Sequence, residues 1–197
     1  MRTKIAVALL VAVAACGGDD GANHLADAPP PPDVAIDTPD PTVTLTTTIA
    51  GTGGGTVTSS PAGITCANGT CTGDFDPDTI VTLTAVPDTG SVFVSWGGAC
   101  TGTTPTCEVT LAQAATVTAT FDLAKYAVTV TKSGAGMGTV AGNGLDCGAT
   151  CTVMLDYGTM LSLTATPANL SVFAGWGGAC SGTAGCTVTV TAPTTIT

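Results

Sequence analysis

The feature that most constrains this chain is an internal repeat. The stretch VFVSWGGACTG at residues 92–102 returns as VFAGWGGACSG at residues 172–182, 80 residues later. Two further elements recur in the same order, namely GTV at 55–57 and 138–140, and VTLTA at 81–85 with LSLTA at 161–165. A chain that repeats itself at such a period forms one structural unit for each copy. We therefore predict two modules, module 1 at residues 42–122 and module 2 at residues 126–197.

Within each copy the apolar residues follow the two-residue period of a β-strand. They alternate mostly with threonine, and Gly or Pro interrupts the pattern at short intervals. The alternating stretches lie at 43–49, 81–85 and 117–121 in module 1, and at 126–130, 161–165 and 188–190 in module 2. No stretch after the N-terminal segment shows a sustained helical period. We predict a compact all-β unit of about six short strands in each copy.

The first residues are typical of an export signal. Two basic residues precede an apolar run over residues 5–15, which is too short for a membrane span of about 20 residues. The sequence Val13-Ala14-Ala15-Cys16 resembles the bacterial lipobox, and this resemblance implies cleavage before Cys16 and its acylation with chains such as palmitate. We therefore expect a lipoprotein signal peptide over residues 1–15 and a lipid anchor at Cys16. The alternative is a simple signal peptide followed by an unmodified cysteine.

Residues 16–41 separate the lipidation site from the first module. They contain six Asp residues and no Lys or Arg, and Pro29 to Pro32 favour a stiff polyproline segment. We predict a disordered tether here, and we assign no role to the chain's single histidine, His24. Gly17 follows Cys16 where Asp would signal retention in the inner membrane. We therefore expect the bacterial outer membrane, at the cell surface or the periplasmic face.

The other eight cysteines fall four in each copy. They are Cys66, Cys71, Cys100 and Cys107 in module 1, and Cys147, Cys151, Cys180 and Cys186 in module 2. Export places them in an oxidising compartment, where small modules commonly gain disulfides. The two copies differ in length inside the first and the last Cys–Cys interval, which indicates loops with a cysteine at each foot. We predict the pairs 66–71, 100–107, 147–151 and 180–186, with a crossed pairing such as 66–100 still open.

The dipeptide Asn68-Gly69 suggests how the first pair forms. Asn-Gly is the strongest short hairpin signal, and a hairpin would place Cys66 opposite Cys71 within disulfide reach. Zinc binding is the alternative for four cysteines, but their spacings match no usual ligand pattern. The predicted fold class is all-β, with two tandem small disulfide-stapled β-modules, β-grasp-like or a small sandwich, after a disordered tether.

The composition disfavours several classes of function. The net charge of −10 and the lack of a basic stripe argue against nucleic-acid binding. Neither module contains a histidine, so no Cys–His or Ser–His pair can form for covalent catalysis. Asp74, Asp76 and Asp78 alternate as in a calcium loop, but only Asp76 has a counterpart in module 2, Asp156, which favours an acidic turn. We expect no enzymatic activity, no cofactor and no bound metal.

The repeated Trp-Gly-Gly-Ala-Cys element is interpreted as structural. Val92, Val94 and Trp96 are predicted to share one face of a strand, and Trp176 is expected in the same place in module 2. Because aromatic residues make up only 4% of the chain, each Trp would be the largest core side chain of its module. The alternative is that both Trp residues are exposed and stack on sugars.

These residues together resemble a known family. The pattern G-T-V, C, C, L-T-A-x-P, F-x-x-W-x-G-A-C-x-G, C-x-V and V-T-A-T-F is similar to the divergent internalin-type B-repeat of bacterial surface proteins. The resemblance covers both copies, and it implies small extracellular β-modules, related to a β-grasp arrangement, without enzymatic activity. Copy two departs from the pattern because it stops at Ile196-Thr197, before the matching Ala-Thr-Phe. We expect either a fragment of a longer repeat protein or a frayed last strand.

These observations predict a lipid-anchored bacterial surface protein whose tandem repeats act as non-catalytic spacer or adhesion modules. Its partners would be the membrane, through Cys16, and an extracellular protein or glycan. A carbohydrate-binding surface lipoprotein that uses exposed Trp96 and Trp176 is the alternative function.

Overall fold

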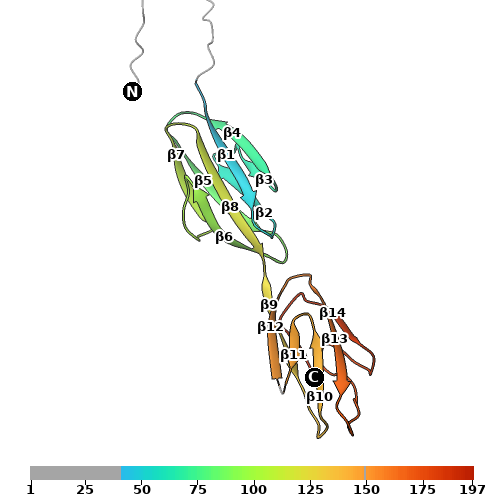
Figure 1. The fold of residues 1–197 in the computed structure, drawn as a ribbon. Coiled ribbons are helices and arrows are strands. Elements are labelled where there is room, and N and C mark those ends of the chain that lie inside the picture. The colour runs from blue at the N-terminus through green and yellow to red at the C-terminus, as the bar shows by residue number, and fades with distance from the viewer. Residues whose placement is uncertain (1–40, 149) are drawn as a thin grey trace, which may run out of the picture. The chain divides into compact units, whose positions relative to one another are not determined.

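The computed structural model describes residues 41–148 and 150–197, and these form fifteen β-strands and no helix (Figure 1). The signal peptide expected at residues 1–15, Cys16 and residues 16–40 of the expected tether lie outside the described residues. Within the described part of the chain, no helix has the length and apolar character needed to cross a membrane. The prediction of an all-β chain with two tandem modules is confirmed.

Module 1 contains eight strands that form two four-stranded sheets. The strands are β1 (Val43–Ala50), β2 (Gly55–Ser60), β3 (Thr65–Cys66), β4 (Thr70–Phe75), β5 (Thr79–Pro87), β6 (Ser91–Gly98), β7 (Thr106–Leu111) and β8 (Ala115–Leu123). One sheet has the order β4-β1-β8-β6, and the other has the order β3-β2-β5-β7. Strands β1 and β8 are parallel, with Leu45 opposite Ala115, while the other neighbouring strands are antiparallel.

Module 2 contains seven strands in the same arrangement. They are β9 (Lys125–Thr131), β10 (Gly138–Gly142), β11 (Leu145–Cys147), β12 (Thr150–Asp156), β13 (Met160–Pro167), β14 (Cys186–Thr189) and β15 (Thr194–Ile196). Sheet β12-β9-β15 repeats β4-β1-β8, and sheet β11-β10-β13-β14 repeats β3-β2-β5-β7. Residues 171–175 take the place of β6 in the sequence of the repeat, but they form no strand.

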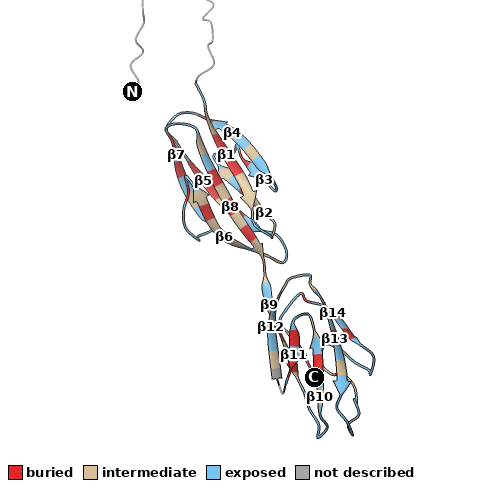
Figure 2. Cartoon of the chain, in the orientation of Figure 1, coloured by how far each residue is buried: buried red, intermediate tan, exposed pale blue. Residues whose placement is uncertain are grey.

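Alternation along the strands separates the core from the surface. On β5, Val81, Leu83 and Ala85 are buried, while Thr82 and Thr84 between them are partly exposed. The inward side chains of the two sheets form one apolar cluster in each module. Figure 2 marks the buried positions along the strands of both modules. Because a fully buried Val or Leu contributes about 1.5–3 kcal/mol, these clusters are the main source of stability.

Two details of the fold refine the expectation from sequence. Each module has more than six strands, because short segments beside the cysteines, such as β3, β4 and β7, also pair into the sheets. Of the two arrangements considered, the small sandwich is the one that forms. Two sheets enclose one core, and the described residues of either module contain no helix of the kind that a β-grasp fold requires.

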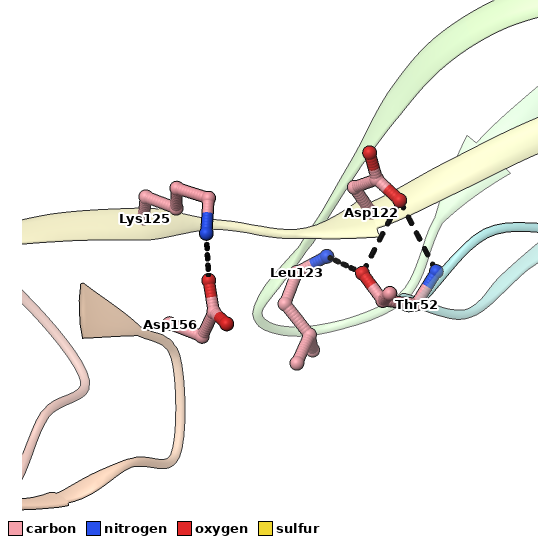
Figure 3. A network of polar contacts seen from close by, with 5 residues as sticks. All are labelled: Thr52, Asp122, Leu123, Lys125 and Asp156. Atoms are coloured by element: carbon pink, nitrogen blue, oxygen red, sulfur yellow. Dashed lines mark hydrogen bonds and ion pairs between the residues drawn. The ribbon is translucent and has the colours of Figure 1, made fainter. Parts of the chain in front are cut away.

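A single residue separates β8 from β9, and each module fixes its own side of this connection (Figure 3). In module 1, the amide and hydroxyl of Thr52 donate to Asp122 Oδ1 at 3.1 and 3.2 Å, and the N–H of Leu123 donates to the Thr52 hydroxyl at 3.2 Å. In module 2, Lys125 Nζ pairs with Asp156 Oδ1 at 2.5 Å. Strand β8 ends at Leu123 and β9 begins at Lys125, so these contacts lie directly beside the connecting residue.

Candidate functional site

Each module is closed by two disulfides that link its two sheets. The pairs, with their Cα–Cα distances, are Cys66–Cys71 (5.6 Å), Cys100–Cys107 (6.1 Å), Cys147–Cys151 (5.3 Å) and Cys180–Cys186 (5.6 Å). These are the pairs between neighbouring cysteines that the loop lengths predict, and all four distances suit a disulfide. Each bridge spans a place where the chain leaves one sheet and enters the other. The bridges therefore hold the two sheets of each sandwich together at its corners.

The local geometry of the first bridge differs from the expected hairpin. Cys66 lies on β3, opposite Val57 of β2, whereas Cys71 lies on β4, opposite Thr47 of β1. The prediction that the two cysteines face each other across one antiparallel pair is therefore wrong. The Asn-Gly turn closes a corner between the sheets, because the residues on its two sides have ladder partners in different sheets.

In each module, a buried tryptophan donates a hydrogen bond into the loop that the second disulfide closes. Trp96 is 4% exposed, and its indole Nε1–H donates to the carbonyl oxygen of Thr104 at 2.9 Å. Trp176 is 8% exposed, and its indole donates to the carbonyl oxygen of Ala184 at 2.6 Å. Both acceptors belong to the disulfide-closed loops. Each Trp is thus a core residue that also fastens such a loop to its module.

The alternation predicted for the strand before Trp96 is wrong. Val92 and Val94 are exposed, whereas the ring of Phe93 packs on Trp96 with 5.2 Å between the ring centroids. The cause is a register shift in β6 between Phe93 and Ser95, which places Val94 at a β-bulge and reverses the alternation. Phe93 and Trp96 therefore share the core although they are three positions apart.

The burial of both indoles removes the basis for the carbohydrate alternative. Sugar stacking needs an open ring face, but Trp96 and Trp176 are buried in the cores of their modules. Aromatic neighbours also contact both indoles, since Phe173 packs on Trp176 at 5.1 Å as Phe93 does on Trp96. The structure contradicts the expectation of exposed Trp residues, and no glycan site is assigned to them.

The aspartates at 74, 76 and 78 of module 1 contact a neighbouring strand and form a tight turn. The hydroxyl of Thr44 donates to Asp74 Oδ1 at 2.7 Å across β1 and β4. The N–H of Thr79 donates to the carbonyl oxygen of Asp76 at 3.2 Å, and Asp78 between them has a φ of 63°. In the described part of the chain, no three His, Cys, Asp or Glu side chains gather as a metal-ion site.

One hollow in module 2 lies beside residues 172–176, which take the place of β6 in the repeat. This partly open hollow of about 300 Å³ is lined by the end of β9, residues 132–138, the end of β13 and residues 172–176. Lys132, Met137 and Phe173 line it. No sequence pattern singled out these residues as a site.

Comparisons with known proteins agree with this architecture. A solved structure entitled "The Bacillus anthracis TIE protein" is similar at 12% sequence identity with a TM-score of 0.50, and the match covers 78% of this chain and 32% of that chain. At this sequence identity the similarity concerns the fold alone. The comparison with curated proteins found no match. A family model described as the divergent InlB B-repeat domain matches residues 45–125 and 126–197. Because that model covers both modules, the chain belongs to the divergent InlB B-repeat family.

Proposed function

We propose that this chain is a bacterial surface lipoprotein, held in the outer membrane by acyl chains on Cys16, and that its modules act as non-catalytic spacer or adhesion units. One observation carries the proposal above the others. Two modules with separate, disulfide-closed cores follow a Pro- and Asp-rich segment and a lipobox-like sequence. A tether of 25 residues after Cys16 would reach roughly 28 Å as a coil, which would place the modules clear of a membrane surface.

The family match and the four disulfides support a location at the cell surface. The divergent B-repeat model covers both modules, which identifies them as repeat units of a surface-protein family. Four disulfides within 156 described residues suit an oxidising space outside the cytoplasm. Gly17, in place of Asp after Cys16, supports the outer rather than the inner membrane.

The use of the polar side chains supports a non-catalytic role. The only histidine of the chain precedes both modules in the sequence. Asp74, Asp122 and Asp156 are engaged in contacts that fasten strands and turns of their own module. The eight cysteine sulfurs of the two modules are joined in disulfides and offer no thiolate nucleophile.

Metabolic labelling tests the anchor. The full chain and its Cys16→Ser variant would be expressed in a Gram-negative host that is fed an alkyne analogue of palmitate. We expect the unmodified chain to take up the label and to fractionate with the outer membrane, and the variant to remain unlabelled and to be released with the soluble envelope fraction. A Cys66→Ser/Cys71→Ser variant serves as the control, since it also lacks cysteines but should keep the label.

Two results would contradict the proposed anchor. One is equal labelling of the unmodified chain and Cys16→Ser, and the other is an unlabelled, soluble unmodified chain. Antibody binding to intact and to permeabilised cells then separates the two faces of the membrane. Display at the cell surface predicts equal binding to both preparations.

A further inference from the structure

The chain contains the dipeptide Asn-Gly twice, and the two copies lie in different kinds of turn. Asn143-Gly144 joins β10 to β11 as a two-residue hairpin, in which Gly142 lies opposite Leu145. Both of its residues have a positive φ, 47° and 81°, as such a hairpin requires. Asn68-Gly69 closes the corner between two sheets, and there only the glycine has a positive φ, 64°. The same reactive dipeptide thus occurs in two structural settings.

Asn-Gly is a chemically labile pair. The backbone nitrogen of the glycine attacks the side-chain carbonyl carbon Cγ of the asparagine, which closes a five-membered succinimide ring and releases Nδ2 as ammonia. Glycine favours this attack because it has no Cβ atom to obstruct it. One water molecule then opens the ring at either carbonyl and leaves aspartate or isoaspartate. The reaction needs a side-chain amide that is free to turn toward the following backbone nitrogen.

The side chain of Asn143 is held in a different orientation by two hydrogen bonds. Its Nδ2 donates to the carbonyl oxygen of Met160 at 3.1 Å, and its Oδ1 accepts from the N–H of Ser162 at 2.8 Å. Both polar atoms of the amide are therefore bound to the backbone of β13. Asn143 is exposed, so these contacts and not burial are what protects it. Attack by the nitrogen of Gly144 would first have to break both of them.

The side chain of Asn68 has no such restraint. Asn68 is exposed, and in the described part of the chain its side-chain amide makes no hydrogen bond. Its contacts run through the backbone carbonyl oxygen, which lies 3.8 Å from Cys66 Sγ and 4.0 Å from Cys71 Sγ. A Cβ atom on Gly69 would have no heavy atom within 4 Å, and the same holds for Gly144. The two glycines are equally accessible, so the asparagine side chains make the difference.

We propose that Asn68 is a site of spontaneous deamidation in the folded protein and that Asn143 is protected. The nitrogen of Gly69 attacks Cγ of Asn68, ammonia leaves, and water opens the ring, so water is the only co-reactant. The product carries one more negative charge at an exposed corner of module 1. The inference depends neither on the anchor at Cys16 nor on a spacer or adhesive role, so the failure of one test leaves the other intact.

The isoaspartate product should change the corner itself. In isoaspartate the backbone runs through the former side-chain Cβ, which adds one methylene group to the loop closed by Cys66 and Cys71. The carbonyl oxygen of Gly69 in that loop accepts a hydrogen bond from the N–H of Ile49 on β1 at 2.8 Å. We expect the longer backbone to weaken this bond and to speed the hydrogen exchange of the Ile49 amide.

The test incubates the unacylated full chain, Cys16→Ser, at mildly alkaline pH in heavy-oxygen water and maps its peptides by mass spectrometry. We expect one heavy oxygen to appear at Asn68, in separate aspartate and isoaspartate products. Asn143 should react at least about tenfold more slowly, because two hydrogen bonds must first break. The reduced chain in urea serves as the internal control, since it has lost those bonds and should deamidate at both asparagines at comparable rates.

Two variants make the test specific. Asn68→Gln keeps the amide but would need a six-membered ring for the same attack, so we expect no label at position 68 and an unchanged unfolding midpoint. Asn68→Asp carries the charge of the product without the extra methylene group. We therefore expect faster exchange of the Ile49 amide in the isoaspartyl chain and unchanged exchange in Asn68→Asp.

The proposal is overturned if Asn68 takes up no label in the folded chain while the urea-unfolded chain does. Equal labelling of Asn68 and Asn143 in the folded chain would also overturn it, because the hydrogen bonds of Asn143 would then give no protection. Equal exchange of the Ile49 amide in the isoaspartyl chain and in Asn68→Asp would contradict the change in the corner.

Discussion

Thr47 of module 1 and Val130 of module 2 occupy the same position in their sheets. Each lies opposite the second cysteine of the first disulfide of its module, Cys71 or Cys151. Both are buried, but Thr47 Oγ1 has no hydrogen-bond partner in the structure. A buried hydroxyl without a partner costs about 1–3 kcal/mol, whereas valine has the same shape and no polar atom to satisfy.

Replacing Thr47 by Val should therefore stabilise module 1. We expect Thr47→Val to raise its free energy of unfolding by about 1 kcal/mol, measured by urea unfolding with Trp96 fluorescence in a Trp176→Phe background. Thr48→Val is the matched control on the same strand, because the hydroxyl of Thr48 contacts Thr70 Oγ1 at 3.2 Å near the surface. A destabilised Thr47→Val variant, or equal gains from both variants, would contradict the explanation.

The disulfides across the sheet corners should each support only their own module. We expect Cys66→Ala/Cys71→Ala to lower the free energy of unfolding of module 1 by about 2 kcal/mol, the loop-closure contribution of so short a loop. Cys147→Ala/Cys151→Ala should leave the transition of module 1 in place. Mass spectrometry after alkylation without reductant should find none of the eight module cysteines modified, and free thiols there would contradict the pairing.

Much of the fold could be predicted because alternation reports directly on the two faces of a sheet. Val81 and Leu83 are buried and the intervening Thr82 is partly exposed, as a half-buried strand requires. The repeat set the number of modules, and the unequal loop lengths indicated which cysteines are neighbours. These signals are local, so they survive without knowledge of the tertiary structure.

The errors arose where a distant partner decides the structure. The bulge at Val94 depends on pairing with β8, and nothing in the alternation of β6 reveals it. The dipeptide Asn68-Gly69 suits a hairpin turn and a corner between two sheets equally well, so its sequence does not distinguish them. The segment before Trp176 has strand-forming residues but forms no strand.

The buried indoles should be visible in fluorescence. We expect Trp96→Phe and Trp176→Phe each to leave one tryptophan with blue-shifted emission that acrylamide quenches weakly, because both rings are buried. Each substitution also removes the indole N–H donor of a part-buried hydrogen bond and should cost about 2 kcal/mol. Emission should not shift when oligosaccharides are added. Strong quenching, or a saturable shift with a glycan, would show that a ring face is accessible.

Leu170 should destabilise module 2 through its backbone. It has a φ of 64° and is fully exposed, while Gly90 at the same position of module 1 has a φ of 77°. The left-handed conformation costs a residue with a Cβ atom about 1–2 kcal/mol, and part of the gain from glycine is lost to its greater freedom in the unfolded chain. We therefore expect Leu170→Gly to raise the free energy of unfolding of module 2 by about 0.5–1 kcal/mol, measured by Trp176 fluorescence in a Trp96→Phe background.

Leu170→Ala separates the causes, because it removes the exposed leucine but keeps the Cβ atom. Equal stabilisation by both variants would trace the effect to the exposed side chain and contradict the backbone explanation.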